Sequence, residues 1–517
     1  MLTWKKLLCD ERFGDIYKKQ SIGTVQNKPD LLSDHQFRLP QERDHDRVLF
    51  CSPFRRLGDK TQVFPLESIE SVRTRLTHSY EVANLARSIG SEIAIKFRDQ
   101  FKAEGLDVED INRQLPAILA AVGLAHDIGN PPFGHQGENA IRAWFARNQD
   151  NLFASEGDCE KAKDINSLTK QHKKDFLHFE GNAQGLRVLS KLLVLGDDLG
   201  LNLTLGTLSS LMKYIGPSNE LDKDVKSRKK VGYFTAEAKL VKQVRKHTGL
   251  SGNTRHPLAL IMEACDDIAY SVIDVEDSIK KSLVSFNDLV EWLERYNQKL
   301  ATDLNTPKDA RSADPIITYL CESAKKAHED LATHNLQPSE LNEVATQRFR
   351  VNAIHIMVCA VVDAFEQNYE SIMGDRFNSD LTSCSQASHL YEALKGFAAQ
   401  NAFSNKSVLQ LELNGYNVIN ELMDFLWMGI SQREDYNELG SRRSNPFASY
   451  VYSRISKNYK RLFEGTVKQY HQGEDLPVRY REMLLLTDMI SGMTDRFCMD
   501  LHSELKQHYV EMQPTAS

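Results

Sequence analysis

Two histidines and two aspartates, spread over three segments of the chain, have side chains suited to holding a metal ion. His126 and Asp127 end an apolar segment, LPAILAAVGLAHD, and the GNPP run from Gly129 to Pro132 then stops the helix that this segment predicts. Apolar residues surround that helix on almost all sides, which is typical of a core position. A buried aspartate there needs a metal ion or a cation as its partner. The alternative is a His–Asp pair that caps the helix or forms a salt bridge.

His78 lies on the apolar stripe of a second predicted helix. Four apolar residues follow it at helical spacing: Val82, Leu85, Ile89 and Ile93. The imidazole should therefore face the core, toward the first helix. A lone core histidine is more often hydrogen-bonded than metal-bound, but its pairing with His126 and Asp127 favours a ligand.

A third predicted helix, from His256 to about Lys280, carries the fourth candidate. On a wheel of 100° per residue, Asp266 borders the apolar arc, and Tyr270 and Asp274 follow on the same side. We expect Asp267 and Asp277 to belong to a solvated acidic face, as such charge runs usually do. Two imidazoles and two carboxylates suit Mn, Mg, Fe or Zn, with positions left open for water and substrate.

The rest of the chain must position these three segments, and its pattern predicts an all-α fold. Only 15 prolines and 27 glycines punctuate 517 residues, and apolar residues recur mostly at intervals of three and four. Polar stretches such as 99–113 and 148–175 are expected to be loops or insertions within a helical body.

Composition excludes several other classes of protein. The net charge of −7, from 64 basic and 71 acidic residues, excludes a globally basic nucleic-acid coat. Eight scattered cysteines without a C-x-x-C pair indicate buried thiols in a reducing cytosol. No apolar run approaches the roughly 18 residues of a membrane span, so we predict a cytoplasmic protein that does not cross a membrane.

Longer strings around the candidate residues resemble those of the bacterial deoxyguanosine triphosphate triphosphohydrolases, a branch of the HD phosphohydrolase superfamily. The strings are KTQVFPLE (60–67), RTRLTHS (73–79), HDIGNPPFGHQGE (126–138), HFEGNAQG (178–185), DDIAY (266–270) and ISGMTD (490–495). The resemblance implies an all-helical protein that hydrolyses dGTP, or another dNTP, to the deoxynucleoside and intact inorganic triphosphate. It also implies an N-terminal segment (1–50), an HD phosphohydrolase core (51–300) and a C-terminal helical part packed on that core (301–517).

The same resemblance assigns roles residue by residue. It implies a divalent metal ion, Mn²⁺ or Mg²⁺, with four ligand residues: His78, His126, Asp127 and Asp266. The implied catalytic residues are His135, with Glu138 orienting it, and His178. The implied substrate contacts are Gln62, Arg75, Lys213, Tyr270 and Asp274. Lys229 and Lys230 are further candidates to close over the triphosphate.

Related enzymes are often hexameric and can bind single-stranded DNA, so the resemblance implies a homo-oligomer and a DNA effector. One alternative function is another HD-type phosphohydrolase or nucleotidase, which product analysis would distinguish. The other is a regulatory protein that binds single-stranded nucleic acid. Under that alternative, the candidate residues for base stacking and phosphate contact are Tyr450, Tyr452, Tyr459 and Lys460.

Overall fold

The computed structural model describes residues 1–16, 37–64, 72–193, 199–302, 312–401, 403–465 and 476–512. Within these ranges the regular structure is helical, apart from one short parallel pair of strands, β1 (Gly216–Pro217) and β2 (Val231–Tyr233). The all-α prediction is therefore confirmed. None of the helices in the described ranges is long and apolar enough to cross a lipid bilayer.

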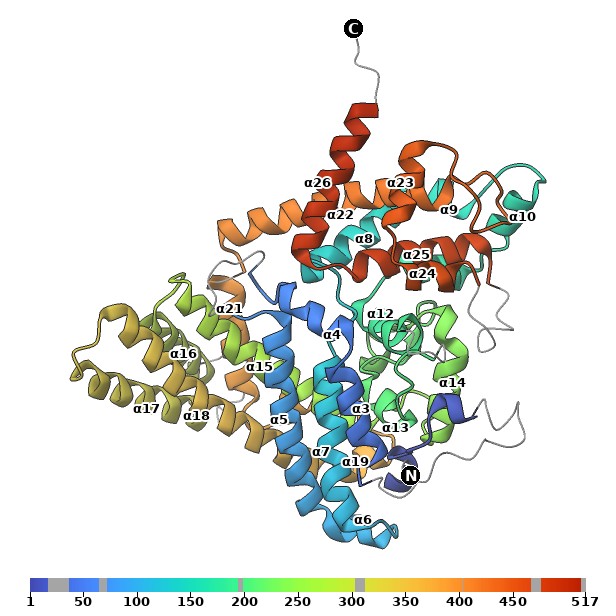
Figure 1. Cartoon of the computed structure of the whole chain (residues 1–517). Coiled ribbons are helices and arrows are strands. Elements are labelled where there is room, and N and C mark those ends of the chain that lie inside the picture. Colours follow the sequence, from blue (N-terminus) through green and yellow to red (C-terminus); the bar gives the residue numbers. More distant parts are fainter. Residues whose placement is uncertain are drawn as a thin grey trace.

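Four helices form the centre of the molecule. Helices α5 (Arg75–Lys96) and α7 (Val108–Ala125) run side by side, α3 (Pro40–Leu49) packs along α7, and α15 (Pro257–Lys280) contacts both α5 and α7 (Figure 1). His256 begins α15 as its N-cap, since its ring nitrogen accepts a hydrogen bond from the amide of Leu258. The predicted third helix is thus present with nearly the predicted bounds.

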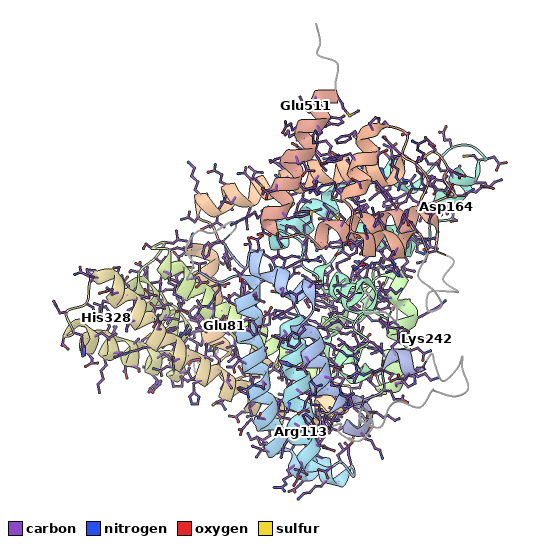
Figure 2. All side chains as sticks on the ribbon, viewed as in Figure 1. Glu81, Arg113, Asp164, Lys242, His328 and Glu511 are labelled. Carbon is purple, nitrogen blue, oxygen red and sulfur yellow. The ribbon has the colours of Figure 1, made fainter. Side chains whose placement is uncertain are left out.

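Two groups of helices flank this centre (Figure 1). One contains α16 (Phe286–Thr302), α17 (Pro315–Ala332), α18 (Pro338–Gln367) and α21 (Ser388–Asn401), and His328 of α17 marks it in Figure 2. The other contains α8 (Gly134–Arg147), α22 (Lys406–Ser431), α23 (Pro446–Arg454), α25 (Val478–Ser491) and α26 (Asp495–Met512). Asp164, also labelled in Figure 2, joins α10 (Glu160–Asn166) to the start of α25 by accepting hydrogen bonds from the amides of Val478 and Arg479.

Shorter helices fill the connections between these groups. They are α1 (Trp4–Leu7), α4 (Ser52–Arg56), α6 (Arg98–Ala103), α9 (Gln149–Phe153), α10 (Glu160–Asn166), α11 (Lys170–Leu177), α12 (Gly181–Arg187), α13 (Leu205–Leu211), α14 (Ala238–His247), α19 (Tyr369–Met373), α20 (Leu381–Cys384) and α24 (Lys457–Phe463).

The prediction of loops in the polar stretches was wrong in two places. Residues 99–113 lie largely in α6 and the first turns of α7, which Asp107 caps by accepting hydrogen bonds from the amides of Glu109 and Asp110. Residues 148–175 contain α9, α10 and most of α11. Each of these short helices buries a few apolar side chains and exposes the rest, so the overall polarity of the stretch concealed them.

Two large apolar clusters meet along α7. Ile118 and Val122 belong to the cluster shared with α15, α18 and α21, whereas Leu124 and Ala125 belong to the cluster shared with α8, α22 and α25. His126 follows directly. The first candidate segment therefore ends where the two apolar clusters join.

Candidate metal centre and active site

Three of the four predicted metal ligands converge from three helices. His78 lies in the first turns of α5, His126 follows the last residue of α7, and Asp266 lies in the first half of α15. The Nε2 atoms of the two histidines lie 3.2 and 3.6 Å from Oδ1 of Asp266, and one potential ligand atom from each residue lies within 4.8 Å of the others. The centres of the two imidazole rings are 5.4 Å apart.

Asp127 lies at the edge of this cluster. Its Oδ2 is 3.6 Å from Nε2 of His126 and forms a 2.8 Å ion pair with Arg75, while its Oδ1 accepts a hydrogen bond from the side chain of Asn130. Burial alone would raise the pKa of Asp127, but its ion pair with Arg75 and the nearby rings of His126 and His78 hold that pKa below its ordinary value. The carboxylate is therefore ionised, with one oxygen directed toward the cluster of His78, His126 and Asp266.

The donor atoms of the cluster fit a divalent metal ion. Nδ1 of His126 lies 2.7 Å from the carbonyl oxygen of Gly123, which places the ring proton there and leaves a lone pair on Nε2. That Nε2 atom is buried and has no hydrogen-bond partner. Burial opposes ionisation of Asp266, yet His126, His78 and Lys213 hold its pKa well below the ordinary value. A buried imidazole nitrogen beside an ionised carboxylate is a donor set typical of Mn²⁺, Fe²⁺ or Zn²⁺ sites.

The expectation of a solvated acidic face on α15 was wrong. Asp277 is only 2% exposed and lies 2.5 Å from Arg73, which also pairs with Glu276 and with Glu81 of α5. Figure 2 labels Glu81 on α5. Asp267 is half-buried and accepts a hydrogen bond from Thr382. The acidic residues point inward because α15 is packed by helices on several sides, including α5, α18, α20 and α21.

A second functional group comes from the start of α8. Nδ1 of His135 lies 3.2 Å from Oε2 of Glu138, and 83% of the His135 side chain is exposed. Glu138 is buried, and its Oε1 accepts a 2.7 Å hydrogen bond from the amide of Gly181. Burial would raise the pKa of Glu138, but hydrogen bonding to His135 and nearby positive charges keep it below its ordinary value. An ionised carboxylate thus orients an accessible imidazole.

His178 is the C-cap of α11 and directly precedes Phe179. It is exposed, and partial burial together with the charges of Lys174 and Arg142 lowers its pKa. Arg142 donates to the carbonyl oxygen of Phe179 and to the carboxylate of Glu180.

Sequence reasoning missed two members of this network, Glu180 and Arg142. Glu180 is buried and accepts from Lys230 at 2.7 Å as well as from Arg142 at 2.9 Å. The sequence did contain signals for both, because Glu180 lies within the HFEGNAQG string and Arg142 is one helical turn beyond Glu138. Sequence reasoning identified Lys230 only as a candidate contact for the triphosphate. Its hydrogen bond to Glu180 places its ammonium group beside the network that contains His135 and Glu138.

Lys213 lies close to the cluster of His78, His126 and Asp266. Its Nζ is 3.6 Å from both Glu263 and Asp266. Burial would lower the pKa of Lys213, but these carboxylates raise it above its ordinary value. Lys213 is therefore a fixed positive charge beside the cluster.

Two of the remaining predicted substrate contacts, Gln62 and Asp274, have buried polar atoms that lack partners. Tyr270 is half-buried, and its ring packs at 6.0 Å from that of Phe403. Asp274, one turn further along α15, is 1% exposed, and its Oδ2 has no hydrogen-bond partner. Oε1 of Gln62 is likewise buried without a partner. Buried unpartnered oxygens are uncommon in proteins and indicate positions that a bound ligand can satisfy.

Comparisons with known proteins agree with this arrangement. The HD domain family matches residues 75–184, which include His78, His126, Asp127, His135 and His178. A deoxyguanosinetriphosphate triphosphohydrolase-like protein of Listeria monocytogenes is 34% identical over 508 residues, covering 98% of this chain and 99% of the relative. The deoxyguanosinetriphosphate triphosphohydrolases of Cronobacter sakazakii and Salmonella typhimurium are 33% and 31% identical, each covering 92% of this chain and 95% of the relative. The chain therefore belongs to the deoxyguanosinetriphosphate triphosphohydrolase family of HD-domain proteins.

Proposed function

We propose that this protein hydrolyses dGTP to deoxyguanosine and intact inorganic triphosphate, and that it requires a divalent metal ion. One observation carries the proposal. A buried histidine nitrogen with a free lone pair, Nε2 of His126, lies 3.6 Å from the ionised Asp266 in a chain whose relatives are named for this reaction over nearly its whole length. Other dNTPs are candidate substrates of the same site.

The metal ion, Mn²⁺ or Mg²⁺, would be held by His78, His126 and Asp266, with Asp127 beside them. Bound there, it would polarise a phosphoryl oxygen and lower the pKa of a bound water molecule. Arg75 holds Asp127 in place through their ion pair. Arg75 and Lys213 supply positive charge for a triphosphate, whose hydrolysis depends mainly on charge neutralisation and positioning.

His135 is the proposed general acid for the leaving 5′ oxygen of the deoxyribose. Because Nδ1–H donates to Glu138, a general acid here is the imidazolium form, whose transferable proton is on Nε2. Glu138 keeps its orientation because its other oxygen is bound by the amide of Gly181. His178 and Lys230 lie near the same network and would contact the phosphate chain.

The deoxyribose is proposed to bind against Tyr270. A ring held against C2′ leaves no room for a 2′-hydroxyl group and gives it no hydrogen-bond partner, which would select deoxyribonucleotides. The partnerless oxygens of Gln62 and Asp274 are suited to the sugar hydroxyl.

Three further properties remain predictions for this chain. We predict a homo-oligomer, with a hexamer as the leading candidate, single-stranded DNA as an effector, and a cytoplasmic location. All eight cysteines are free thiols, which supports a reducing compartment. The expectation that they are buried was wrong for Cys159, Cys359 and Cys384, which are exposed. A protein that acts mainly by stacking nucleic-acid bases is less well supported. Tyr459 is buried, and Tyr452 lies under Arg443 with its hydroxyl donating to Glu464.

The test is to incubate the purified protein with each of the four dNTPs and with GTP, in Mn²⁺ or Mg²⁺, and to separate the products. We expect deoxyguanosine and intact triphosphate from dGTP, and loss of turnover after chelation of the metal. His135→Ala should lower kcat by about 10² to 10⁴ while the metal content stays unchanged. His126→Ala should instead lower metal binding, measured by titration in the absence of nucleotide.

His355→Ala is the matched control, because His355 is an exposed histidine on α18, outside the site. It should leave both turnover and metal binding unchanged. Release of orthophosphate or pyrophosphate would identify a different phosphohydrolase. Near wild-type turnover of His135→Ala would exclude the role proposed for that residue.

A further inference from the structure

The ISGMTD string at residues 490–495 has no role in the proposed mechanism, although it lies against two segments of the site. It connects α25 to α26, more than 350 residues after His135 in the chain. The carbonyl oxygen of Ser491 accepts a hydrogen bond from Lys60 at 2.7 Å, and that of Gly492 accepts from Arg56 at 2.8 Å. The string therefore contacts the segment that leads to Gln62.

Asp495, the last residue of the string, links that segment to the start of α8. Its Oδ1 accepts a 3.1 Å hydrogen bond from the amide of Phe133. Its Oδ2 accepts a 2.9 Å hydrogen bond from the amide of Thr61 and another from the Thr61 hydroxyl group. The carboxylate is only 3% exposed, so these donors replace the water that it would otherwise bind.

The position of Phe133 explains why this contact matters for His135. Phe133 is the N-cap of α8, has a left-handed backbone with φ of 59°, and gives α8 no side-chain cap. A bulky residue keeps that conformation only where its surroundings hold it there. His135 follows two residues later, so the direction in which α8 begins sets the position of the imidazole.

Lys60 extends the same connection to Asp127, at the edge of the cluster of His78, His126 and Asp266. Its ammonium group is 3% exposed and donates to the carbonyl oxygens of Asn130, at 2.6 Å, and Ser491, at 2.7 Å. The side chain of Asn130 in turn donates to Oδ1 of Asp127. The 490–495 string thus reaches both the loop that follows Asp127 and the start of α8.

We propose that Asp495 is a positioning residue that fixes the His135–Glu138 pair relative to the Thr61–Gln62 segment. This inference rests on the proposed function, in which His135 acts on the phosphate and Gln62 on the sugar of one nucleotide. The carboxylate suits this task because both of its oxygens are acceptors and all three donors face it. An amide in its place would direct an NH₂ group at one of the two backbone N–H donors.

The kinetic test uses Asp495→Asn at saturating metal. Misplacement of reacting groups by about 1 Å can cost about 10²-fold in rate, so we expect kcat to fall by about 10- to 100-fold. KM for dGTP should rise as well, because Gln62 is also displaced. In a His135→Ala background the same substitution should lower kcat by less than about twofold, since the imidazole that it positions is gone. An equal loss in both backgrounds would overturn the inference.

A milder variant and a matched control separate positioning from general destabilisation. Thr61→Ala removes only the hydroxyl contact on the Gln62 side, so it should raise KM and leave kcat nearly unchanged. Glu482→Gln alters a different buried carboxylate, on α25, which pairs with Arg433 and Arg479 and not with the donors of Asp495. It should lower thermal stability without changing the kinetic constants. A fall in kcat for Glu482→Gln as large as that for Asp495→Asn would contradict a specific role of Asp495.

Hydrogen–deuterium exchange tests the link without any turnover. In Asp495→Asn we expect faster exchange in peptides covering residues 57–64 and 128–138, and unchanged exchange in peptides from α14. Unchanged exchange in either segment would overturn the inference, even if the enzyme is active. Faster exchange in both segments of a protein that does not hydrolyse dGTP would support the link and reject the proposed function instead.

Discussion

Gly129 provides the most stringent test of how the site is packed. Its Cα faces α12, and a Cβ atom added there would lie 2.0 Å from the amide nitrogen of Gly185, 2.1 Å from the carbonyl oxygen of Gly181 and 2.6 Å from Cα of Gly185. Real Cβ contacts essentially never fall below 3.0 Å, so Gly129→Ala must separate the two backbones by about 1 Å. All three nearest atoms belong to the backbone, and no side chain can turn away to relieve the contact.

That separation would act on both halves of the site. Asp127 lies two residues before Gly129, and the amide of Gly181 holds Glu138. A displacement of about 1 Å can cost about 10²-fold in rate, and overpacking of this kind typically costs about 1–3 kcal/mol of stability. We expect Gly129→Ala to lower kcat for dGTP by about 100-fold and the free energy of unfolding by about 1–3 kcal/mol. Product formation and urea denaturation measure the two effects.

Gly185→Ala is the matched control from the other side of the same contact. Its added Cβ would lie 3.4 Å from the amide nitrogen of Gly129 and 3.7 Å from Cα of Gly129, which are ordinary van der Waals distances. Because Gly185 lies within α12, alanine should also favour the helix by up to about 1 kcal/mol. We therefore expect Gly185→Ala to retain kcat within about threefold. Equal effects of the two substitutions, or wild-type behaviour of Gly129→Ala, would refute the reasoning.

Two further predictions concern selectivity and pH. Tyr270→Ala should relax the preference for dGTP over GTP, because the ring that leaves no room for a 2′-hydroxyl is removed; an unchanged ratio of kcat/KM values would exclude this role. Burial raises the pKa of Asp175 from 3.8 to about 6, despite hydrogen bonds from Ser218, Thr235 and Tyr480. Because the folded protein binds this proton more tightly, the stabilisation is fully present below pH 4 and is lost as pH rises through 6. Relative to Asp175→Asn, the free energy of unfolding of the wild type should fall by about 2 kcal/mol between pH 4 and 7; a constant difference in urea denaturation would contradict this.

The sequence predicted the helices that carry the candidate metal ligands because the apolar periodicity of these helices is strong. His78 and Asp266 each border an apolar stripe, and helical geometry alone directs them inward. His126 was identified from the residues that end its helix. In each case a local pattern sufficed, because the direction of a side chain on a helix depends only on its own helix.

The sequence did not predict which charged faces would be covered. Asp277 looks like part of a solvated face on the helical wheel, but it is buried against Arg73, which lies 204 residues earlier in the chain. The Glu180–Arg142 contact likewise joins α8 to the turn before α12. Such pairs depend on how distant elements pack, and the periodicity of a single helix contains no information about its neighbours.

The strings that resemble the family coincide with places where distant backbones touch. Gly129 of HDIGN meets Gly181 and Gly185 of HFEGNAQG, and Asp495 of ISGMTD binds the amides of Thr61 and Phe133. Most of these residues carry no reactive group. Their types are restricted because a side chain would not fit, or because a buried amide needs an acceptor. Such strings therefore specify how segments of the site lie against one another as much as they specify its chemistry, and substitutions that disturb these backbone contacts, as Gly129→Ala and Asp495→Asn do, should impair turnover through geometry.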